Sequence, residues 1–255
     1  MGQVIPFSDV DIFLGKLSNK AGCLVDTNFL IALSEEHHPF NDDAHFLFEK
    51  LVEHKIKLYC TVTNRTEFID FQRKLIITET LMGMLSPVSK WKISAATRKQ
   101  LATQRGWIDN QAKEDELPLL TDKRIKDCKK EFLPKTQSGQ IGWVELCKEF
   151  LNNQLLQAWT TLSESLQLNY IEMRTGESDR YFAKPLDWEK MYSLSEETCL
   201  ASSDAMILNV LNSSIFPFVI SADYDMAYGV LKNAEDKSIL VPDALYRRHL
   251  RGLRF

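Results

Sequence analysis

The amino-acid sequence predicts an α/β protein with a central, mostly parallel sheet between layers of helices. Residues 21–85 and 195–255 each alternate short apolar runs with amphipathic helical patterns, an order typical of parallel strands joined by right-handed helical crossovers. Residues 86–190 contain helical patterns and no convincing strand. We therefore expect one three-layer α/β/α domain, formed by residues 1–85 and 191–255, with a helical insertion between its two parts.

The first part of the chain predicts two strands and three helices. Apolar runs at 22–26 and 57–62 are short and continuous, as buried parallel strands are. A helix follows the first run directly, and Asn41 is a candidate N-cap for a second helix over 42–54. A third helix follows the second run.

The last part of the chain repeats this alternation. Ser195 is a candidate N-cap for its first helix, and turn-forming residues such as Pro217 separate the elements that follow. The predicted elements are a helix over 195–212, a strand over 218–222, a helix over 224–233, a strand over 238–241 and a helix over 243–251.

The middle of the chain predicts helices near 92–104, 121–132 and 140–172. The last of these would be about 50 Å long at 1.5 Å per residue. Because that length exceeds a small domain, we expect a break near Asn152 and Asn153. Residues 174–187 have the composition of a loop.

Bulk composition excludes several classes of protein. The chain has 255 residues, of which 44% are hydrophobic and 26% charged, and a net charge of −4, so it is neither disordered nor a general polyanion binder. Five scattered cysteines without a CxxC motif favour reduced thiols in a cytoplasmic protein. No signal peptide, membrane span or nucleotide-binding glycine motif is evident.

Four carboxylates occupy positions that folding alone does not readily explain. Asp26 and Asp223 each end an apolar run, Glu67 follows a third run, and Asp204 lies inside an apolar helical pattern. Because strand ends in open α/β sheets meet at one crevice, we expect these acids to lie close together. Their mutual repulsion would require cations, and oxygen ligands without His or Cys suit Mg²⁺ or Mn²⁺.

Each acid also has a structural interpretation. Asp26 and Asp223 could be simple N-caps of the helices that follow them. Glu67 stands three residues after Asn64, the spacing of a capping box.

Asp204 is the hardest of the four to explain as a structural residue. It shares a helical stripe with apolar residues, where a carboxylate is costly unless it is paired or bound to metal. No Lys or Arg occurs between Lys190 and Lys232, so a structural role would need a salt bridge from a distant residue. The apolar members of the stripe are Leu200, Ile207, Leu208 and Leu211.

Four motifs in this order resemble those of the PIN-domain nucleases, a family that includes VapC-type toxins and eukaryotic RNA-processing enzymes. The resemblance covers roughly residues 20–85 and 195–245. The matching segments are Leu24-Val25-Asp26-Thr27-Asn28, Thr63-Asn64-Arg65-Thr66-Glu67, Ser203-Asp204-Ala205-Met206-Ile207 and Ile220-Ser221-Ala222-Asp223-Tyr224-Asp225.

The resemblance implies a metal-dependent endonuclease acting on single-stranded RNA, with Mg²⁺ or Mn²⁺ as cofactor. The implied catalytic and metal-binding tetrad is Asp26, Glu67, Asp204 and Asp223. Asp225 is implied as an additional, outer metal ligand. Asn28 and Ser221 are implied as the polar residues that support the site.

The chain departs from the small toxins of this family, because Asp204 lies 137 positions after Glu67. We therefore expect a larger PIN protein whose insertion selects its substrate or partner. A protein inhibitor or a second copy of the chain are further candidate partners. Two alternatives stay open: a catalytically inactive PIN-like scaffold that binds RNA or protein, and a structure-specific DNA nuclease.

Two basic stretches are candidates for nucleic-acid binding. Residues 88–107 contain five basic residues, no acid and two tryptophans, and the C-terminal segment is also basic. Cations neutralise phosphates and tryptophan stacks on unpaired bases; the alternative is a solvated helix face with core tryptophans. The predicted contacts are Lys90, Trp91, Lys92, Arg98, Lys99, Arg105, Arg247 and Arg248.

Overall fold

The chain divides into two compact units in the computed structural model. The first unit comprises Met1–Glu67 and Leu162–Phe255, and the second comprises Phe68–Thr161. The sequence placed the insertion at 86–190, whereas the helical unit of the structure is shorter and begins earlier. The structure describes residues 2–18, 21–113, 117–171, 179–234 and 236–251.

The first unit is built on one six-stranded sheet in the order β1-β6-β5-β2-β3-β4. Every strand pair is parallel, which confirms the predicted α/β fold class. The strands are β1 (Gln3–Pro6), β2 (Cys23–Val25), β3 (Leu58–Cys60), β4 (Asn169–Tyr170), β5 (Phe218–Ile220) and β6 (Ser238–Val241).

The sequence did not predict either of the two edge strands of the sheet, β1 and β4. Strand β4 lies in the range expected to contain only helices, and it pairs with β3 through Tyr59–Asn169 and Cys60–Tyr170. It has two half-buried residues, so it lacks the apolar run that marks a central strand. Strand β1 is also only partly buried, because it closes the other edge.

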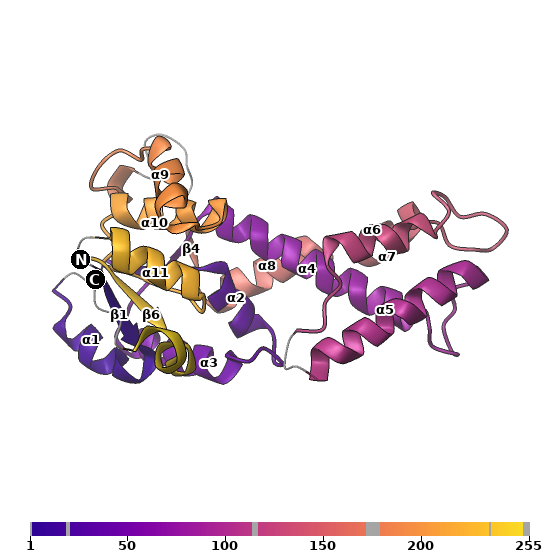
Figure 1. Cartoon of the computed structure of the whole chain (residues 1–255), viewed down its shortest axis with the longest axis horizontal. Coiled ribbons are helices and arrows are strands. Elements are labelled where there is room, and N and C mark those ends of the chain that lie inside the picture. Colours follow the sequence, from indigo (N-terminus) through magenta and orange to yellow (C-terminus); the bar gives the residue numbers. More distant parts are fainter. Residues whose placement is uncertain (1, 19–20, 114–116, 172–178, 235, 252–255) are drawn as a thin grey trace. The chain divides into compact units, whose positions relative to one another are not determined.

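Helices cover the two faces of the sheet in separate groups (Figure 1). Helices α9, α10 and α11 pack on one another, and α11 packs on β1 and β6; α1 and α2 pack on α3. The result is a three-layer α/β/α arrangement. The helices of this unit are α1 (Val10–Lys16), α2 (Thr27–Ser34), α3 (Asn41–Glu53), α9 (Glu189–Thr198), α10 (Ser202–Ser213), α11 (Tyr224–Asn233) and α12 (Asp243–Leu245).

Two helix predictions for the last part of the chain were wrong. The expected helix over 195–212 is two helices, because Cys199 adopts a left-handed conformation with φ 59° and ends α9. Ser195 therefore lies inside α9 and does not cap a helix. The expected helix over 243–251 is a short α-helix followed by a π-helical turn at Tyr246–Leu250.

We predict that replacing Gly22 and replacing Gly15 by alanine change the free energy of unfolding in opposite directions. Gly22 precedes β2 with φ +121°, and a Cβ there would lie 2.6 Å from the carbonyl oxygen of Lys57. We expect Gly22→Ala to lower the free energy of unfolding by about 2 kcal/mol or more. Gly15 is exposed in α1, where a Cβ meets nothing within 4 Å, so Gly15→Ala should raise it by about 0.5–1 kcal/mol. Urea unfolding measures both, and equal effects would contradict the Gly22 geometry.

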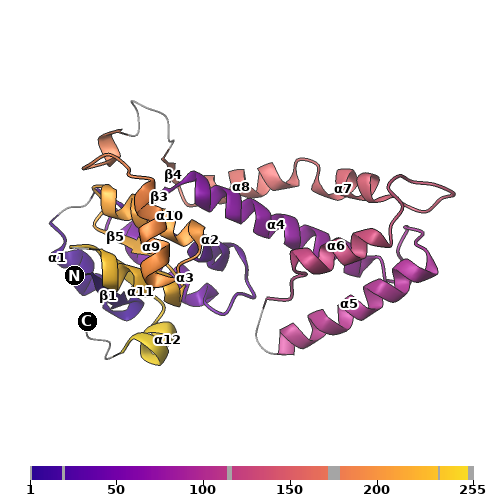
Figure 2. The ribbon, with the colours of Figure 1, turned by 45° about the horizontal axis from the view of Figure 1, so that its top comes forward.

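The second unit is helical. The predicted break at Asn152–Asn153 is confirmed, because Asn153 has φ 61° between α7 and α8. Within this unit α5 packs on α6 (Figure 2). Its helices are α5 (Ala95–Lys113), α6 (Asp122–Lys130), α7 (Trp143–Leu151) and most of α4 (Val62–Gly83) and α8 (Gln154–Ser165), which begin and end, respectively, in the first unit.

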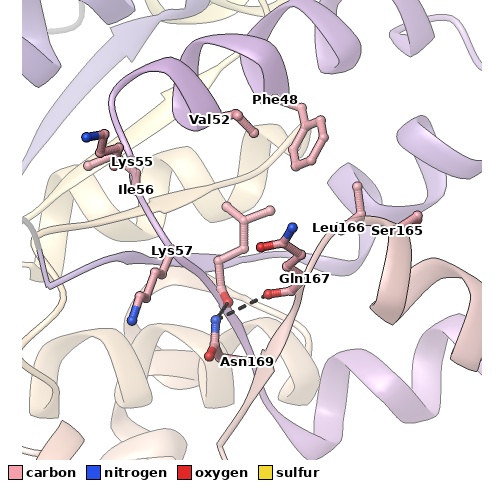
Figure 3. A pocket seen from close by; sticks show the side chains of 10 residues that line it. Phe48, Val52, Lys55, Ile56, Lys57, Ser165, Leu166, Gln167 and Asn169 are labelled. Atoms are coloured by element: carbon pink, nitrogen blue, oxygen red, sulfur yellow. Dashed lines mark hydrogen bonds between the residues drawn. The ribbon is translucent and has the colours of Figure 1, made fainter.

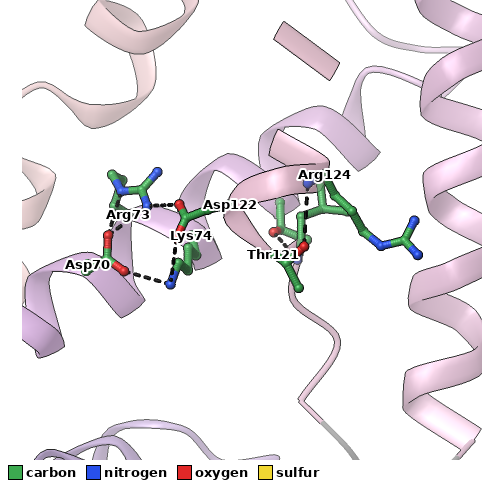
Figure 4. Close-up of polar contacts among 8 residues, drawn as sticks. Asp70, Arg73, Lys74, Thr121, Asp122 and Arg124 are labelled. Carbon is green, nitrogen blue, oxygen red and sulfur yellow. Dashed lines mark hydrogen bonds and ion pairs between the residues drawn. The ribbon is translucent and has the colours of Figure 1, made fainter. Parts of the chain in front are cut away.

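A network of ion pairs joins α4 to α6 in the second unit (Figure 4). Arg73 lies 2.7 Å from Asp70 and 2.5 Å from Asp122, and Lys74 contacts the same two carboxylates. The hydrogen bond from Arg73 lowers the pKa of Asp122 below its usual range. All four side chains are partly exposed, so each pair adds less than about 1 kcal/mol. These acids therefore have cationic partners, in contrast to the acids of the first unit described below.

Candidate functional site

The sheet has a topological switch point between β2 and β5. These strands are neighbours, yet the chain passes from β2 to β3 on one side and from β5 to β6 on the other. Their register pairs Val25 with Ile220, and the backbone N–H of Asp26 donates to the carbonyl of Ile220 at 2.8 Å. Ligands of open α/β sheets bind at the carboxyl ends of strands at such a point.

Asp26 stands at this switch point as a buried carboxylate. Its Oδ1 accepts from the backbone N–H of Thr27 at 2.6 Å, and its Oδ2 accepts from Ser221 Oγ at 2.6 Å. Asp26 is therefore the N-cap of α2 as well as one of the four acids predicted for the site. Burial raises the pKa of Asp26 to about 7; the Ser221 hydrogen bond opposes this, and the negative charge of Asp204 adds to it.

The capping-box interpretation of Glu67 was wrong. Helix α4 begins at Val62, and Asn64 Oδ1 accepts from the Thr61 backbone N–H at 2.8 Å and from its Oγ1 at 2.9 Å. Asn64 thus satisfies the start of the helix in place of Glu67. The Glu67 carboxylate, one turn later, instead accepts from Thr27 Oγ1 at 2.5 Å.

Asp204 lies in the first turn of α10 and is partly buried. Burial, together with the negative charges of Asp223, Glu67 and Asp225, raises its pKa to about 7. No hydrogen bond or ion pair to its carboxylate occurs within the described residues. The distant salt bridge considered for Asp204 is therefore not found in that part of the chain.

Asp223 caps α11 beside these acids. Its Oδ1 accepts from the backbone N–H of Asp225 at 2.6 Å, and Asn28 Nδ2 points to its Oδ2 at 3.4 Å. The Ser221 hydroxyl links the two strand ends, because it donates to Asp26 and accepts from the Asp223 backbone N–H at 3.0 Å. The structure thus brings all seven tetrad and supporting residues predicted from the sequence to one place.

Thr27 is a site residue that the sequence analysis did not select. Its hydroxyl donates to Glu67, and it lies 3.4 Å from Asn64 Nδ2. The side chain is 4% exposed, so it fixes the Glu67 carboxylate from inside the protein. The sequence feature that could have identified Thr27 is its position: a hydroxyl residue directly after Asp26, at the start of a helix.

Removal of the Thr27 hydroxyl should destabilise the protein. We expect Thr27→Val to lower the free energy of unfolding by about 1–3 kcal/mol, because a buried hydrogen bond to a carboxylate is lost. Thr66→Val is the matched control: its exposed hydroxyl donates to Val62 O of its own helix, so the change should stay within about 0.5 kcal/mol. Urea unfolding of both variants measures the difference, and equal losses would contradict the role of Thr27.

The chemistry of the donor set fits a hard divalent cation, since every ligand candidate is a carboxylate oxygen. Within the described residues, however, no three His, Cys, Asp or Glu side chains stand close enough to hold an ion. The acids form an electrostatic cluster rather than a closed coordination sphere.

The predicted nucleic-acid contacts fall in both units. Lys90, Lys92, Arg98, Lys99 and Arg105 are exposed on the second unit. The two tryptophans of residues 88–107 pack against the core of that unit, and a cation lies over each: Lys90 Nζ is 4.5 Å from the Trp91 ring centroid and Arg124 is 4.0 Å from the Trp107 ring centroid. Both rings therefore pack as the alternative interpretation, core tryptophans on a solvated helix face, expects. Base stacking by Trp91 stays a prediction.

Arg247 and Arg248 are exposed on the π-helical turn of the first unit. His249 in the same turn contacts Tyr224 with ring centroids 5.3 Å apart. Because Tyr224 directly follows Asp223, this basic turn adjoins the acidic cluster.

A separate cavity of about 350 Å³ lies at the opposite ends of the strands (Figure 3). Residues at and before the starts of β3 and β4 line it, and Asn169 Nδ2 donates to the carbonyls of Leu58 at 3.1 Å and Gln167 at 3.3 Å. It contains no member of the acidic cluster. The strand-end rule therefore assigns the candidate site to the carboxyl ends.

Comparisons of the chain with protein-family models, with curated proteins and with solved structures find no match. Among the residues that the structure describes, no helix has the length and apolar character needed to cross a membrane.

Proposed function

We propose that the chain is a PIN-type, metal-dependent endonuclease that hydrolyses phosphodiester bonds, in single-stranded RNA rather than DNA. The observation that carries the proposal is the cluster of acids at the switch point, two of which have a pKa near 7. None of the ion pairs found among the described residues includes a member of the tetrad. A cluster of like charges without internal cations is costly for folding and suited to binding them.

The tetrad of Asp26, Glu67, Asp204 and Asp223 would hold one or two Mg²⁺ or Mn²⁺ ions. Such ions lower the pKa of an attacking water and neutralise charge on the phosphodiester. Asp225, which is exposed two residues after Asp223, would act as an outer ligand. Ser221, Asn28 and Thr27 orient the carboxylates through the hydrogen bonds given above.

Protonation of the cluster couples cation binding to pH. With a pKa near 7, Asp26 and Asp204 each retain a proton in part of the molecules at neutral pH. A ligand carboxylate must be deprotonated, so binding should release protons and weaken as the pH falls below 7.

The substrate backbone would be held by cations outside the cluster. Arg247 and Arg248 adjoin the site through the contact between His249 and Tyr224, and the exposed cations of the second unit would add to the attraction. The preference for RNA rests on the sequence resemblance.

A second candidate function is a catalytically inactive PIN-like scaffold that binds RNA or protein. It is favoured by one observation: no three acids among the described residues are close enough to hold an ion. On this alternative the acids would stay apart, and the exposed cations would bind a partner without cleaving it.

A cleavage assay on matched single-stranded RNA and DNA oligonucleotides tests the proposal. We expect RNA cleavage with Mg²⁺ or Mn²⁺, with Mn²⁺ at least as effective, and none with EDTA. Binding without cleavage under any of these conditions would favour the scaffold, whereas preferential cleavage of DNA would favour a structure-specific DNA nuclease. Full cleavage in EDTA would refute the metal-dependent mechanism.

A further inference from the structure

A cavity of about 430 Å³ opens beside the acidic cluster in the first unit. It is lined by the first two turns of α4 and of α10 together with one residue of α9, and Glu67 of the tetrad forms part of its wall. Ser203, also in the wall, precedes Asp204 in the chain. The cavity and the acids thus share the Glu67 side chain, so a molecule bound at the acids lies next to the cavity.

The apolar part of the wall consists of Val62, Met191 and Met206. Val62 is 43% exposed at the start of α4, an apolar surface that water covers when the cavity is empty. Methionine side chains adapt to flat rings, and their sulfur makes favourable contacts with aromatic groups. This surface therefore suits a planar aromatic ligand.

The polar part of the wall consists of hydroxyl groups. Thr66 donates to its own helix at Val62 O and keeps an acceptor. Ser202 and Ser203 make no side-chain hydrogen bond within the described residues, so they can both donate and accept. Such groups match the edge of any base.

Charge excludes a phosphate from the same cavity. Among the residues that the structure describes, no Lys or Arg lines it, and Glu67 is the one charged side chain in its wall. An anion would be repelled there, whereas the uncharged base of a nucleotide would not.

We propose that this cavity receives the unpaired base of the nucleotide next to the scissile phosphate and thereby positions a single-stranded substrate. The inference rests on the proposed nuclease function and adds a binding site to it. It also supplies a physical reason for a single-stranded substrate, because a base stacked in a duplex cannot enter the cavity.

The test uses a single-stranded RNA with a mapped cleavage position and a series of copies that each carry one abasic nucleotide. We expect one abasic position, adjacent to the cut, to raise KM about tenfold, the usual scale for loss of one bound base. Thr66→Leu, which narrows the cavity, should raise KM for the intact RNA by a similar factor. In this variant the abasic nucleotide should cost no more than about twofold.

Ser193→Leu is the matched control, because Ser193 is an exposed hydroxyl residue of α9 that donates to its own helix and does not line the cavity. It should behave as wild type. Ser202→Leu, at the opposite wall, repeats the test should Thr66→Leu fold poorly by circular dichroism. Metal-dependent cleavage that is indifferent to every abasic position and to both variants would overturn this inference alone. Absence of cleavage would overturn the proposed function and this inference with it.

Discussion

Replacement of Asp204 by asparagine is expected to slow cleavage by about 100-fold or more without destabilising the metal-free protein. Loss of one group that stabilises charge in the reaction typically has at least this effect on rate. Stability should be retained because the wild-type carboxylate is partly buried among Glu67, Asp223 and Asp225, and no cation of the described residues lies beside it. An uncharged amide removes that repulsion and adds no volume.

Asp122→Asn is the matched control for Asp204→Asn. Asp122 is an acid in the first turn of α6, paired with Arg73 and Lys74 in the second unit. Its variant should cleave normally and melt at the same temperature or slightly lower. Cleavage rates with Mn²⁺ and thermal melts in EDTA distinguish the two. If Asp204→Asn melts at a much lower temperature than wild type and still cleaves at the wild-type rate, Asp204 is a structural residue.

The metal-free protein is expected to lose stability as the pH rises from about 4 to about 8. The pKa of Asp26 is near 7 in the folded chain and near 3.8 in its ordinary state, so the folded protein binds more protons between these values. The contribution of Asp26 to the free energy of unfolding is therefore greatest below pH 4, and it is lost as the pH rises through 7. Each unit of pKa corresponds to about 1.4 kcal/mol, which makes the loss from Asp26 on the order of 4 kcal/mol.

Urea unfolding at a series of pH values in EDTA measures this loss. Asp204→Asn should show a shallower dependence than wild type, since its own carboxylate no longer titrates and no longer repels Asp26. Saturating Mn²⁺ should restore stability at pH 8, because a ligand that binds only the folded state stabilises it. A metal-free protein that gains stability between pH 5 and pH 8 would contradict the buried, uncompensated state of these acids.

The central sheet could be predicted because its inner strands are short, continuous apolar runs. Strands β2, β3 and β5 are buried at every position. Short continuous apolar runs between helices are typical of such strands, because both faces of the sheet are covered. The edge strand β4 could not be predicted, since it consists of two half-buried residues. Pairing with β3, rather than a local pattern, holds it in the sheet.

The position of the acids could be predicted, but their local hydrogen bonds could not. Strand ends bring Asp26 and Asp223 together whatever the side-chain details. The capping box assigned to Glu67 failed because α4 begins two residues before Asn64, so Asn64 itself closes the helix start. A helix that begins at Val62 and one that begins a few residues later have the same apolar pattern, so the sequence does not distinguish the two starting points.

The division of the chain was harder to predict than its secondary structure. Helix α4 begins in the sheet unit and continues through the boundary at Glu67, so no linker of glycine, proline or polar residues marks the change. Residues 162–171, which the sequence placed in the insertion, belong to the first unit because β4 pairs with β3.

The central claim is that the acids at the switch point form a divalent-cation site, and calorimetric titration of Mn²⁺ into metal-free protein at pH 7.5 tests it most directly. We predict saturable binding of one or two ions to wild type, accompanied by proton release. Asp122→Asn should bind as wild type does, and the double variant Asp26→Asn and Asp204→Asn should not bind measurably. Binding of equal strength to wild type and to the double variant, or no binding to wild type, would contradict the claim.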